Sequence, residues 1–245
     1  MVKPLVITMG DPTGVGPEII VRAVSSGALR SVVRPLLVAG DPGVLLRAAD
    51  VCGCAGRWQP GSQQALATGE LRLGEQLLPV RSLSELDLSQ QRFGRPEISS
   101  GRAMADYIEW ACDACIAGDV AGMVTAPINK AALQAAGVTF PGHTELLAAR
   151  CQVDDEVMML AGDKLRVCLV TTHCALAEVP QRLSAERILT TLRITAASLQ
   201  GQFGIKAPRL AVLALNPHAG EESLFGEVEA PTIITAITTT VAEGR

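Results

Sequence analysis

Short apolar segments alternate with helical patterns along most of the chain, and this alternation constrains the fold more than any other feature. Strands are predicted at residues 4–9, 35–39, 120–125, 157–161, 165–172 and 209–215. Helices are predicted from Pro17 onward and at residues 44–49, 100–117, 129–136, 145–151 and 185–203. Such alternation is typical of a parallel sheet with helices on both faces. The less regular residues 52–88 are expected to contain further strands, so the predicted fold class is α/β.

The amino-acid composition fits a sheet of this kind. Apolar residues make up 48% and aromatic residues 3% of the 245 residues, so the core must consist mainly of Val, Ile, Leu and Ala. These side chains suit a parallel sheet that is buried on both faces. The net charge of −4 and the lack of a Lys/Arg cluster argue against nucleic acid as a partner.

Hydropathy and cysteine usage indicate a cytoplasmic protein that does not enter a membrane. No apolar segment reaches transmembrane length, and residues 1–9 lead into a strand rather than a signal peptide. The seven cysteines are odd in number and scattered, which is typical of reduced thiols. Cys112 and Cys115 have CxxC spacing but lie within a predicted helix. Because a structural zinc site needs four ligands, we interpret this pair as part of a packed helix face.

Two of the three histidines follow predicted strands, where an open α/β sheet binds its ligands. His173 follows the strand at 165–172, and His218 lies in the segment NPHAGE after the strand at 209–215. Neutral imidazole binds divalent metal ions well, so the pair is a candidate metal site. A hydrogen bond within each loop is the alternative role. A catalytic metal needs at least three protein ligands, and no third ligand is indicated by spacing.

The third histidine lies in the segment PGHTE, directly before a predicted helix. We expect Thr144 to cap that helix, and the free N–H groups of a helix N-terminus favour anions. His143 and Thr144 are therefore candidates for binding a phosphate or carboxylate, with a plain helix cap as the alternative. Lys130 follows the strand at 120–125 and is a weak candidate for substrate contact or proton transfer; a solvated helix lysine is the alternative.

A glycine-rich loop, GDPTGVG, follows the first strand and invites comparison with nucleotide-binding loops. Its spacing does not match G-x-G-x-x-G, because Ile19 stands where the third glycine would be. It lacks the Gly-Lys-Ser/Thr end of a phosphate-binding loop. We therefore assign the loop to backbone packing near the ligand site, with a nucleotide-phosphate cradle as the weaker alternative. Asp11 and Glu18 are possible polar contributors, and Asp11 is a second weak catalytic candidate.

Taken in order, these segments resemble one family, the 4-hydroxythreonine-4-phosphate dehydrogenases of vitamin B6 synthesis. The motifs that carry the resemblance are ITMGDPTGVGPEI at 7–19, TAPINK at 125–130, FPGHTELLA at 140–148, LRVCLVTTH at 165–173 and LALNPHAGE at 213–221. The resemblance implies a fold like that of isocitrate and isopropylmalate dehydrogenases, with two domains and an active-site cleft between them. We expect a first domain at 1–125 and a second at 126–245 that carries the metal histidines and the dimer contacts. That fold binds its nicotinamide cofactor without the G-x-G-x-x-G motif.

The resemblance also implies an activity and a set of ligands. His173 and His218 match metal-ligand positions for Zn, Mg, Mn or Co, and His143 and Thr144 match substrate positions, most plausibly at the phosphate. The implied reaction is the NAD- or NADP-dependent oxidation of 4-phosphooxy-L-threonine, followed by decarboxylation, in pyridoxal 5′-phosphate biosynthesis. A homodimer in the cytoplasm is expected. The cofactor-binding residues are not assigned.

One departure from the family pattern concerns the C-terminal region. The family carries a third metal-binding histidine in a His-Asp-Gln-Gly segment, and no histidine follows His218 here. This C-terminal return segment is absent from the 245 residues, so we expect the chain alone to have little or no activity. Two alternatives stay open. One is a dehydrogenase of threonate or erythronate 4-phosphate, and the other is a truncated, non-catalytic member of the family. The GHT segment favours a phosphorylated substrate over a cyclic dihydrodiol.

Overall fold

The computed structural model describes residues 2–140, 142–220 and 229–242. The chain forms two compact units, Met1–Gln152 and Val153–Arg245, and each is described by itself. The predicted domain boundary between residues 125 and 126 lies before two helices that pack within the first unit. A domain division at that position stays a prediction.

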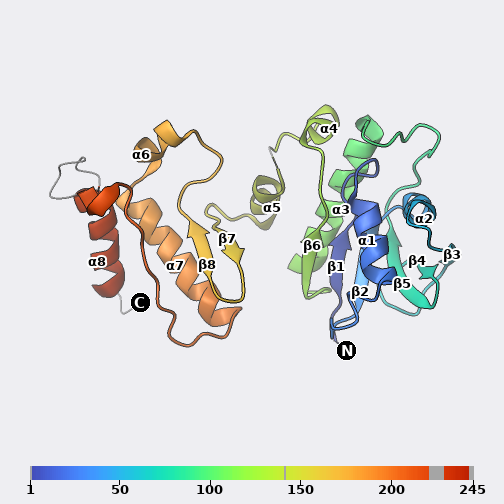
Figure 1. The fold of residues 1–245 in the computed structure, drawn as a ribbon, viewed down its shortest axis with the longest axis horizontal. Coiled ribbons are helices and arrows are strands. Elements are labelled where there is room, and N and C mark those ends of the chain that lie inside the picture. Colours follow the sequence, from blue (N-terminus) through green and yellow to red (C-terminus); the bar gives the residue numbers. More distant parts are fainter. Residues whose placement is uncertain (1, 141, 221–228, 243–245) are drawn as a thin grey trace. The chain divides into compact units, whose positions relative to one another are not determined.

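The first unit is built on a mixed sheet of six strands (Figure 1). Three neighbouring strands at one edge are parallel: β2 (Leu36–Gly40), β1 (Leu5–Thr8) and β6 (Gly122–Thr125). The irregular residues 52–88 supply β3 (Gly56–Pro60), β4 (Gly69–Leu73) and β5 (Gln76–Ser82). Strand β4 is antiparallel to both β3 and β5, and β5 joins β2 in parallel. The predicted α/β sheet is confirmed, with an antiparallel extension.

The described residues of this unit form the helices α1 (Gly16–Ser25), α2 (Pro42–Val51), α3 (Ile98–Ile116), α4 (Lys130–Ala135) and α5 (His143–Cys151). Their starts follow local chemistry, because the Asp41 and Asn129 side chains cap α2 and α4 by accepting backbone N–H groups. Helix α3 packs against β1, β2 and β6, whereas α1 and α2 pack on each other and against the antiparallel strands. Tyr107, Met9 and Leu37 are among the largest fully buried side chains.

The second unit contains less sheet and a smaller core. Strands β7 (Met158–Ala161) and β8 (Arg166–Leu169) form an antiparallel pair. The helices are α6 (Val179–Arg182), α7 (Ala185–Gly201) and α8 (Thr235–Ala242), with 3₁₀ turns at Leu176–Glu178 and Pro217–Gly220 and a π-helical turn at Glu229–Ile234. Ile188, Ile233 and Ala236 form its buried cluster.

The strand predicted at 209–215 is wrong. These residues are irregular, and Leu213 is 83% exposed. An apolar segment becomes a strand only when a neighbouring strand satisfies its N–H and C=O groups. Among the described residues of the second unit, only β7 and β8 form a ladder. Strand β8 also ends at Leu169, three residues before the predicted end.

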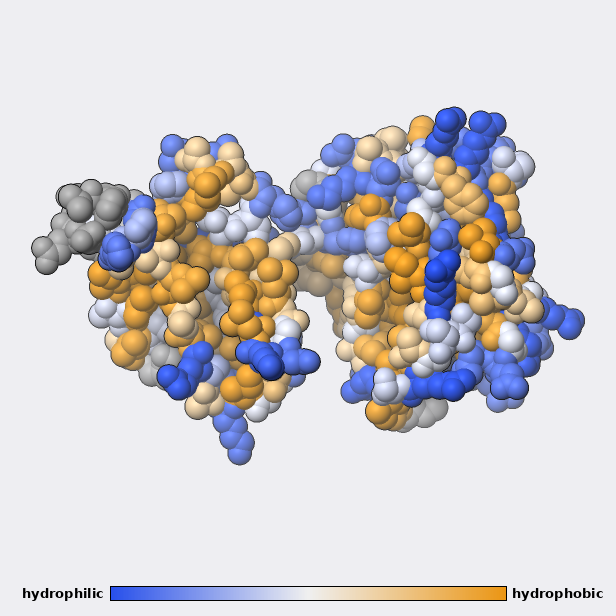
Figure 2. Space-filling model, viewed as in Figure 1, coloured by the Kyte–Doolittle hydropathy of each residue, from blue (hydrophilic) through white to orange (hydrophobic). Residues whose placement is uncertain are grey.

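The second unit exposes several large apolar side chains, and apolar residues cover much of its visible surface in Figure 2. Leu160, Leu165 and Leu176 are exposed by 60%, 69% and 86%, and Val241 by 67%. Grouped apolar surface of this kind is typical of a site that contacts further polypeptide. None of the helices in the described part of the chain is long and apolar enough to span a bilayer.

Candidate functional site

The loops that follow β1 and β6 meet at the carboxyl end of the parallel strands. The Asp11 N–H donates to the Pro127 carbonyl at 2.9 Å. Gly10 has a φ of +73°, and an ideally placed Cβ on it would lie 2.3 Å from the same carbonyl oxygen. The sequence therefore needs glycine here both for the left-handed backbone and for the close approach of the two loops.

Asp11 stabilises its own loop. Its Oδ1 accepts hydrogen bonds from the Thr13 N–H and the Thr13 Oγ1, both at 2.8 Å. Asp11 is 7% exposed and Thr13 is 2% exposed, so these bonds are largely shielded from water. The carboxylate is engaged in holding the turn, and its predicted catalytic role stays a prediction.

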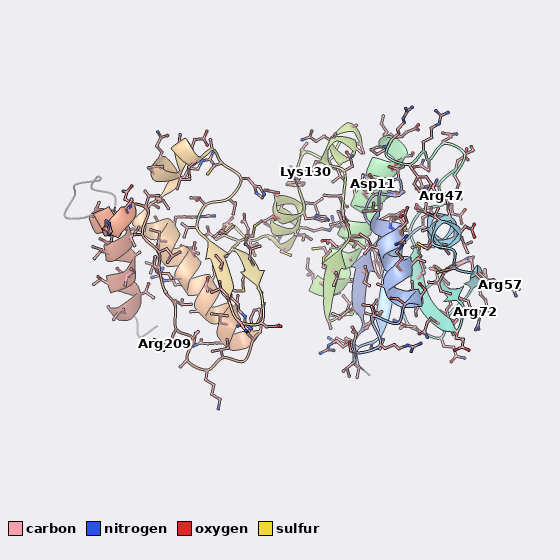
Figure 3. All side chains as sticks on the ribbon, viewed as in Figure 1. Asp11, Arg47, Arg57, Arg72, Lys130 and Arg209 are labelled. Carbon is pink, nitrogen blue, oxygen red and sulfur yellow. The ribbon has the colours of Figure 1, made fainter. Side chains whose placement is uncertain are left out.

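Arg47 on α2 fastens the glycine-rich loop to the segment before α3 (Figure 3). Its guanidinium donates to the Pro12 carbonyl at 2.9 Å and to the Gln91 carbonyl at 2.5 Å. The same group lies 4.5 Å from the centroid of the Phe93 ring. Burial lowers the pKa of Arg47, with Asp41 acting in the opposite direction. Sequence reasoning missed this residue, since a single arginine on an amphipathic helix carries no signal for a contact across 44 residues.

The glycines of this loop face protein atoms. A Cβ on Gly16 would lie 2.4 Å from the Met9 carbonyl oxygen, and one on Gly14 would lie 3.2 Å from the Asp11 Cβ. Both positions are filled by neighbouring protein rather than left open as a concave surface for phosphate. This close packing agrees with the assignment of the loop to backbone packing, and the alternative of a nucleotide-phosphate cradle stays a prediction.

A second group of polar residues surrounds the start of α5. The helix begins at His143 with Gly142 at the N-cap position, and no side chain caps it. The prediction that Thr144 caps this helix is wrong, because Gly142 is extended and the first turn starts two residues earlier than expected. Thr144 lies in the first turn instead and is partly buried, as is His143.

The His143 side chain has an unused nitrogen. Its Nε2 is buried and has no hydrogen-bond partner among the described residues. Burial lowers the pKa of His143, and the nearby Lys130 ammonium lowers it further. At neutral pH the ring is therefore uncharged, and a buried ring nitrogen without a partner is costly unless a ligand or water satisfies it. The neutral ring, the Lys130 charge and the free N–H groups of the first turn of α5 together suit an anion.

A surface hollow of about 760 Å³ lies beside the N-terminal ends of α3 and α4. It is lined by Gln90, Pro96, Glu97, Ile98, Ser99, Asn129, Ala131, Ala132 and Ala135. Its size is within the range of small-molecule sites in proteins. Asn129 in its lining directly precedes Lys130, which Figure 3 labels, so the hollow adjoins the segment that follows β6 at the carboxyl end of the parallel strands.

In the second unit His173 lies in a loop and His218 in the 3₁₀ turn Pro217–Gly220, and both are exposed. Their backbones adopt positive φ values of 51° and 52°, which non-glycine residues rarely adopt. His173 follows β8 by four residues, whereas His218 follows the irregular segment 209–215, so the expectation that His218 follows a strand is wrong. In the part of the chain that the structure describes, no three His, Cys, Asp or Glu side chains gather to hold a metal ion.

Comparison with known proteins connects this arrangement to one family. A family model described as pyridoxal phosphate biosynthetic protein PdxA matches residues 31–245. A 4-hydroxythreonine-4-phosphate dehydrogenase from Trichlorobacter lovleyi is 49% identical over 99% of this chain and 71% of its own length. One from Desulfosudis oleivorans is 46% identical over 96% of this chain and 68% of its own length. A crystal structure of a 4-hydroxythreonine-4-phosphate dehydrogenase from Klebsiella pneumoniae matches with a TM-score of 0.85 at 34% identity, covering 100% of this chain and 72% of that one. The predicted α/β fold of the isocitrate and isopropylmalate dehydrogenase type is confirmed by this match.

Proposed function

Because the chain belongs to the PdxA family of pyridoxal phosphate biosynthetic proteins, and is thereby an oxidoreductase acting on a CH–OH group, we propose that it oxidises 4-phosphooxy-L-threonine. The observation that carries this proposal is the 49% identity, over 99% of the chain, with a relative named for that substrate. The product would enter the synthesis of pyridoxal 5′-phosphate.

The start of α5 is the proposed site for the substrate phosphate. Support comes from the buried, unpartnered Nε2 of His143 and from the free N–H groups of the first helical turn. Thr144 adds a hydroxyl in the same turn, and the Lys130 ammonium adds a positive charge close enough to lower the pKa of His143. A dianionic phosphate would accept from all of these donors, whereas an uncharged diol would offer no opposite charge to the Lys130 ammonium.

His173 and His218 are proposed ligands of a divalent metal ion, and their fit to that role is partial. Imidazole is a suitable ligand for Zn or Co. Both histidines are exposed and have positive φ values, and strained backbone conformations of this kind are concentrated at binding sites. A complete catalytic site needs three protein ligands, and the described residues do not supply such a group.

The reaction divides into two chemical steps. The secondary alcohol of the hydroxy acid loses its hydroxyl proton to water, and NAD or NADP, when bound, would accept the hydride from the C–H bond that breaks. The β-keto acid that results loses CO₂. In these steps His143 and Thr144 hold the phosphate end, Lys130 neutralises anionic charge on the substrate, and Asp11 and Arg47 keep the strand-end loops in place beside it.

Substrate turnover by the purified chain tests the proposal. Nicotinamide reduction is followed with 4-phosphooxy-L-threonine, threonate 4-phosphate, erythronate 4-phosphate and unphosphorylated 4-hydroxythreonine, each with NAD or NADP and with Zn, Mg, Mn or Co. Turnover by this chain is expected to be low, and we expect it to be fastest with 4-phosphooxy-L-threonine. A preference for one of the four-carbon phosphorylated acids would support the alternative dehydrogenase, and equal rates on the unphosphorylated compound would overturn the phosphate assignment.

Single-residue variants test the role of each proposed binding residue. His143→Gln and Lys130→Met should weaken binding of the phosphorylated substrate, measured by calorimetry, whereas the matched surface change Lys164→Met should not. His173→Ala and His218→Ala should each lower zinc affinity. Binding of substrate and metal without any turnover would support the non-catalytic alternative for this chain.

A homodimer is also proposed, supported by the exposed apolar side chains of the second unit (Figure 2). The mass measured by light scattering during size-exclusion chromatography tests it, and a monomer at micromolar concentration would contradict it. The cytoplasmic location stays a prediction.

A further inference from the structure

The C-terminal end of α5 is fastened to α3 by a charged contact. The Arg150 guanidinium donates two hydrogen bonds to the Asp113 carboxylate, both at 2.6 Å, and a third to Glu109 at 3.1 Å. Two parallel N–H···O bonds of this kind fix both the distance and the orientation of the partners. The contact between Arg150 and Asp113 therefore fixes the position of α5 relative to α3 at this point.

A pair of thiols lies directly beside that contact. Cys112 precedes Asp113 and Cys151 follows Arg150, and their Sγ atoms are 3.7 Å apart. Cys112 is 2% exposed, whereas Cys151 is an exposed residue at the end of α5. The sulfurs of Cys52 and Cys54 contact backbone carbonyls instead. Those two cysteines also lie in the first unit and are natural controls.

We propose that Cys112 and Cys151 form a redox-reversible disulfide site that reacts with small disulfides such as glutathione disulfide. A disulfide bond needs the two sulfurs about 2.0 Å apart, so the pair must approach by roughly 1.7 Å. Rotation of the exposed Cys151 side chain supplies this movement, while the Arg150–Asp113 contact keeps the helices together.

The reaction is a pair of thiol–disulfide exchanges. The Cys151 thiolate attacks one sulfur of the small disulfide, which forms a mixed disulfide and releases one small thiol. Cys112 then loses its proton to water and attacks the Cys151 sulfur, and the second small thiol leaves. Two protein thiols are oxidised, and one small disulfide is reduced to two thiols.

The surroundings of the two sulfurs decide the order of attack. Burial, aided by contact with Cys151, raises the pKa of the Cys112 thiol to about 12. Cys112 is therefore a poor first nucleophile, and it is also shielded from a dissolved oxidant. Cys115 lies one turn further along α3 and is partly buried; its pKa is raised by burial first and by Cys151 second. It is the competing partner that an experiment must separate from Cys112.

Mass spectrometry of the oxidised protein tests the proposal. The reduced full chain is incubated with glutathione disulfide under native conditions, the remaining thiols are blocked, and the digested protein is searched for linked peptides. We expect a Cys112–Cys151 link in the wild type and in Cys115→Ser, and none in Cys151→Ser. Cys112→Ala should instead retain a mixed disulfide between Cys151 and glutathione, because the resolving thiol is gone. The Cys52→Ser variant should behave like the wild type.

Stability gives an independent measurement. The disulfide closes a loop of 39 residues, and such a link should raise the melting temperature of the first unit by about 5–10 °C, reversed by dithiothreitol. The proposal is overturned if the wild type stops at a mixed disulfide, if Cys115→Ser abolishes the link, or if Cys151 links to Cys115 in the wild type. Because Cys151 is exposed, Cys151→Ser should fold even if Cys112→Ala does not.

Discussion

Replacing Gly10 with alanine should separate the two loops that build the carboxyl end of the sheet. The added Cβ would lie 2.3 Å from the Pro127 carbonyl oxygen and 3.0 Å from two atoms of Ala126. All three are backbone atoms, so no flexible side chain can move aside. The loops must part, and the hydrogen bond from the Asp11 N–H to the Pro127 carbonyl is lost or lengthened.

The cost of Gly10→Ala can be built from three contributions. The left-handed backbone at φ +73° costs alanine about 1 kcal/mol net. Overpacking against backbone adds about 1–3 kcal/mol. Losing a buried backbone hydrogen bond adds about 1 kcal/mol. The free energy of unfolding should fall by about 3–5 kcal/mol, which is a large part of the 5–15 kcal/mol that is usual for a folded domain.

Urea unfolding followed by tryptophan fluorescence measures this cost. Both tryptophans, Trp58 and Trp110, lie in the first unit, so the signal reports on the unit that carries the change. The matched control is Gly53→Ala, because Gly53 has a φ of +67° and nothing within 4 Å of its added Cβ. That control carries the backbone contribution alone and should cost about 1 kcal/mol. Equal costs for the two variants would refute the argument that close approach of the loops requires Gly10.

The remaining predictions concern His143 and Asp41 in the same unit. His143 should titrate below its usual pKa of 6.5. Because the unfolded chain then binds a proton at a higher pH than the folded protein does, the stability that the neutral His143 ring contributes is full above pH 6.5. This stability is lost as the pH falls through the pKa that His143 has in the folded protein. Lys130→Met should raise the His143 pKa only part of the way back to its usual value, because burial is the larger cause of the shift. NMR titration of the three histidines measures this pKa. An unchanged His143 pKa in Lys130→Met would exclude the lysine charge as a cause. Asp41→Ala should cost about 3 kcal/mol, since Asp41 is 2% exposed and its carboxylate accepts from the Val44 N–H, the Leu86 N–H and the Ser84 hydroxyl. Ser84→Ala should lower the free energy of unfolding by about 1 kcal/mol in the same urea experiment, because it removes only one of these hydrogen bonds. Equal costs for the two changes would contradict the conclusion that all three hydrogen bonds to Asp41 stabilise the fold.

Local chemistry accounts for the elements that were predicted correctly. Helices α2, α4 and α7 begin where Asp41, Asn129 and Ser184 can accept a backbone N–H, and these caps depend on residues only three positions apart. Strands β1 and β2 are short apolar segments between turn residues, and such patterns are visible within a window of a few residues. The misplaced cap at Thr144 shows the limit of this reasoning, because the conformation of Gly142 decides where α5 begins.

The strand predicted at 209–215 failed for a different reason. Hydrophobicity marks a segment as able to be a strand, but only a partner strand makes it one, and partners come from the tertiary structure. The same dependence affects the two metal candidates, since the argument for His218 began from a strand end that the structure does not contain. What remains for both histidines is the positive φ value and the family resemblance.

The sequence by itself determined the α/β class, most of the helix starts, the glycine-rich loop and the family, since these depend on residue types within short segments and on the order of motifs. Only the tertiary structure decided the contacts between segments far apart in the chain. Arg47 reaches the Pro12 and Gln91 carbonyls, Gly10 meets Pro127, and Cys112 meets Cys151 across 39 residues. Each of these contacts depends on how whole helices and loops pack, and packing is set by shape and burial over the entire unit rather than by any local pattern.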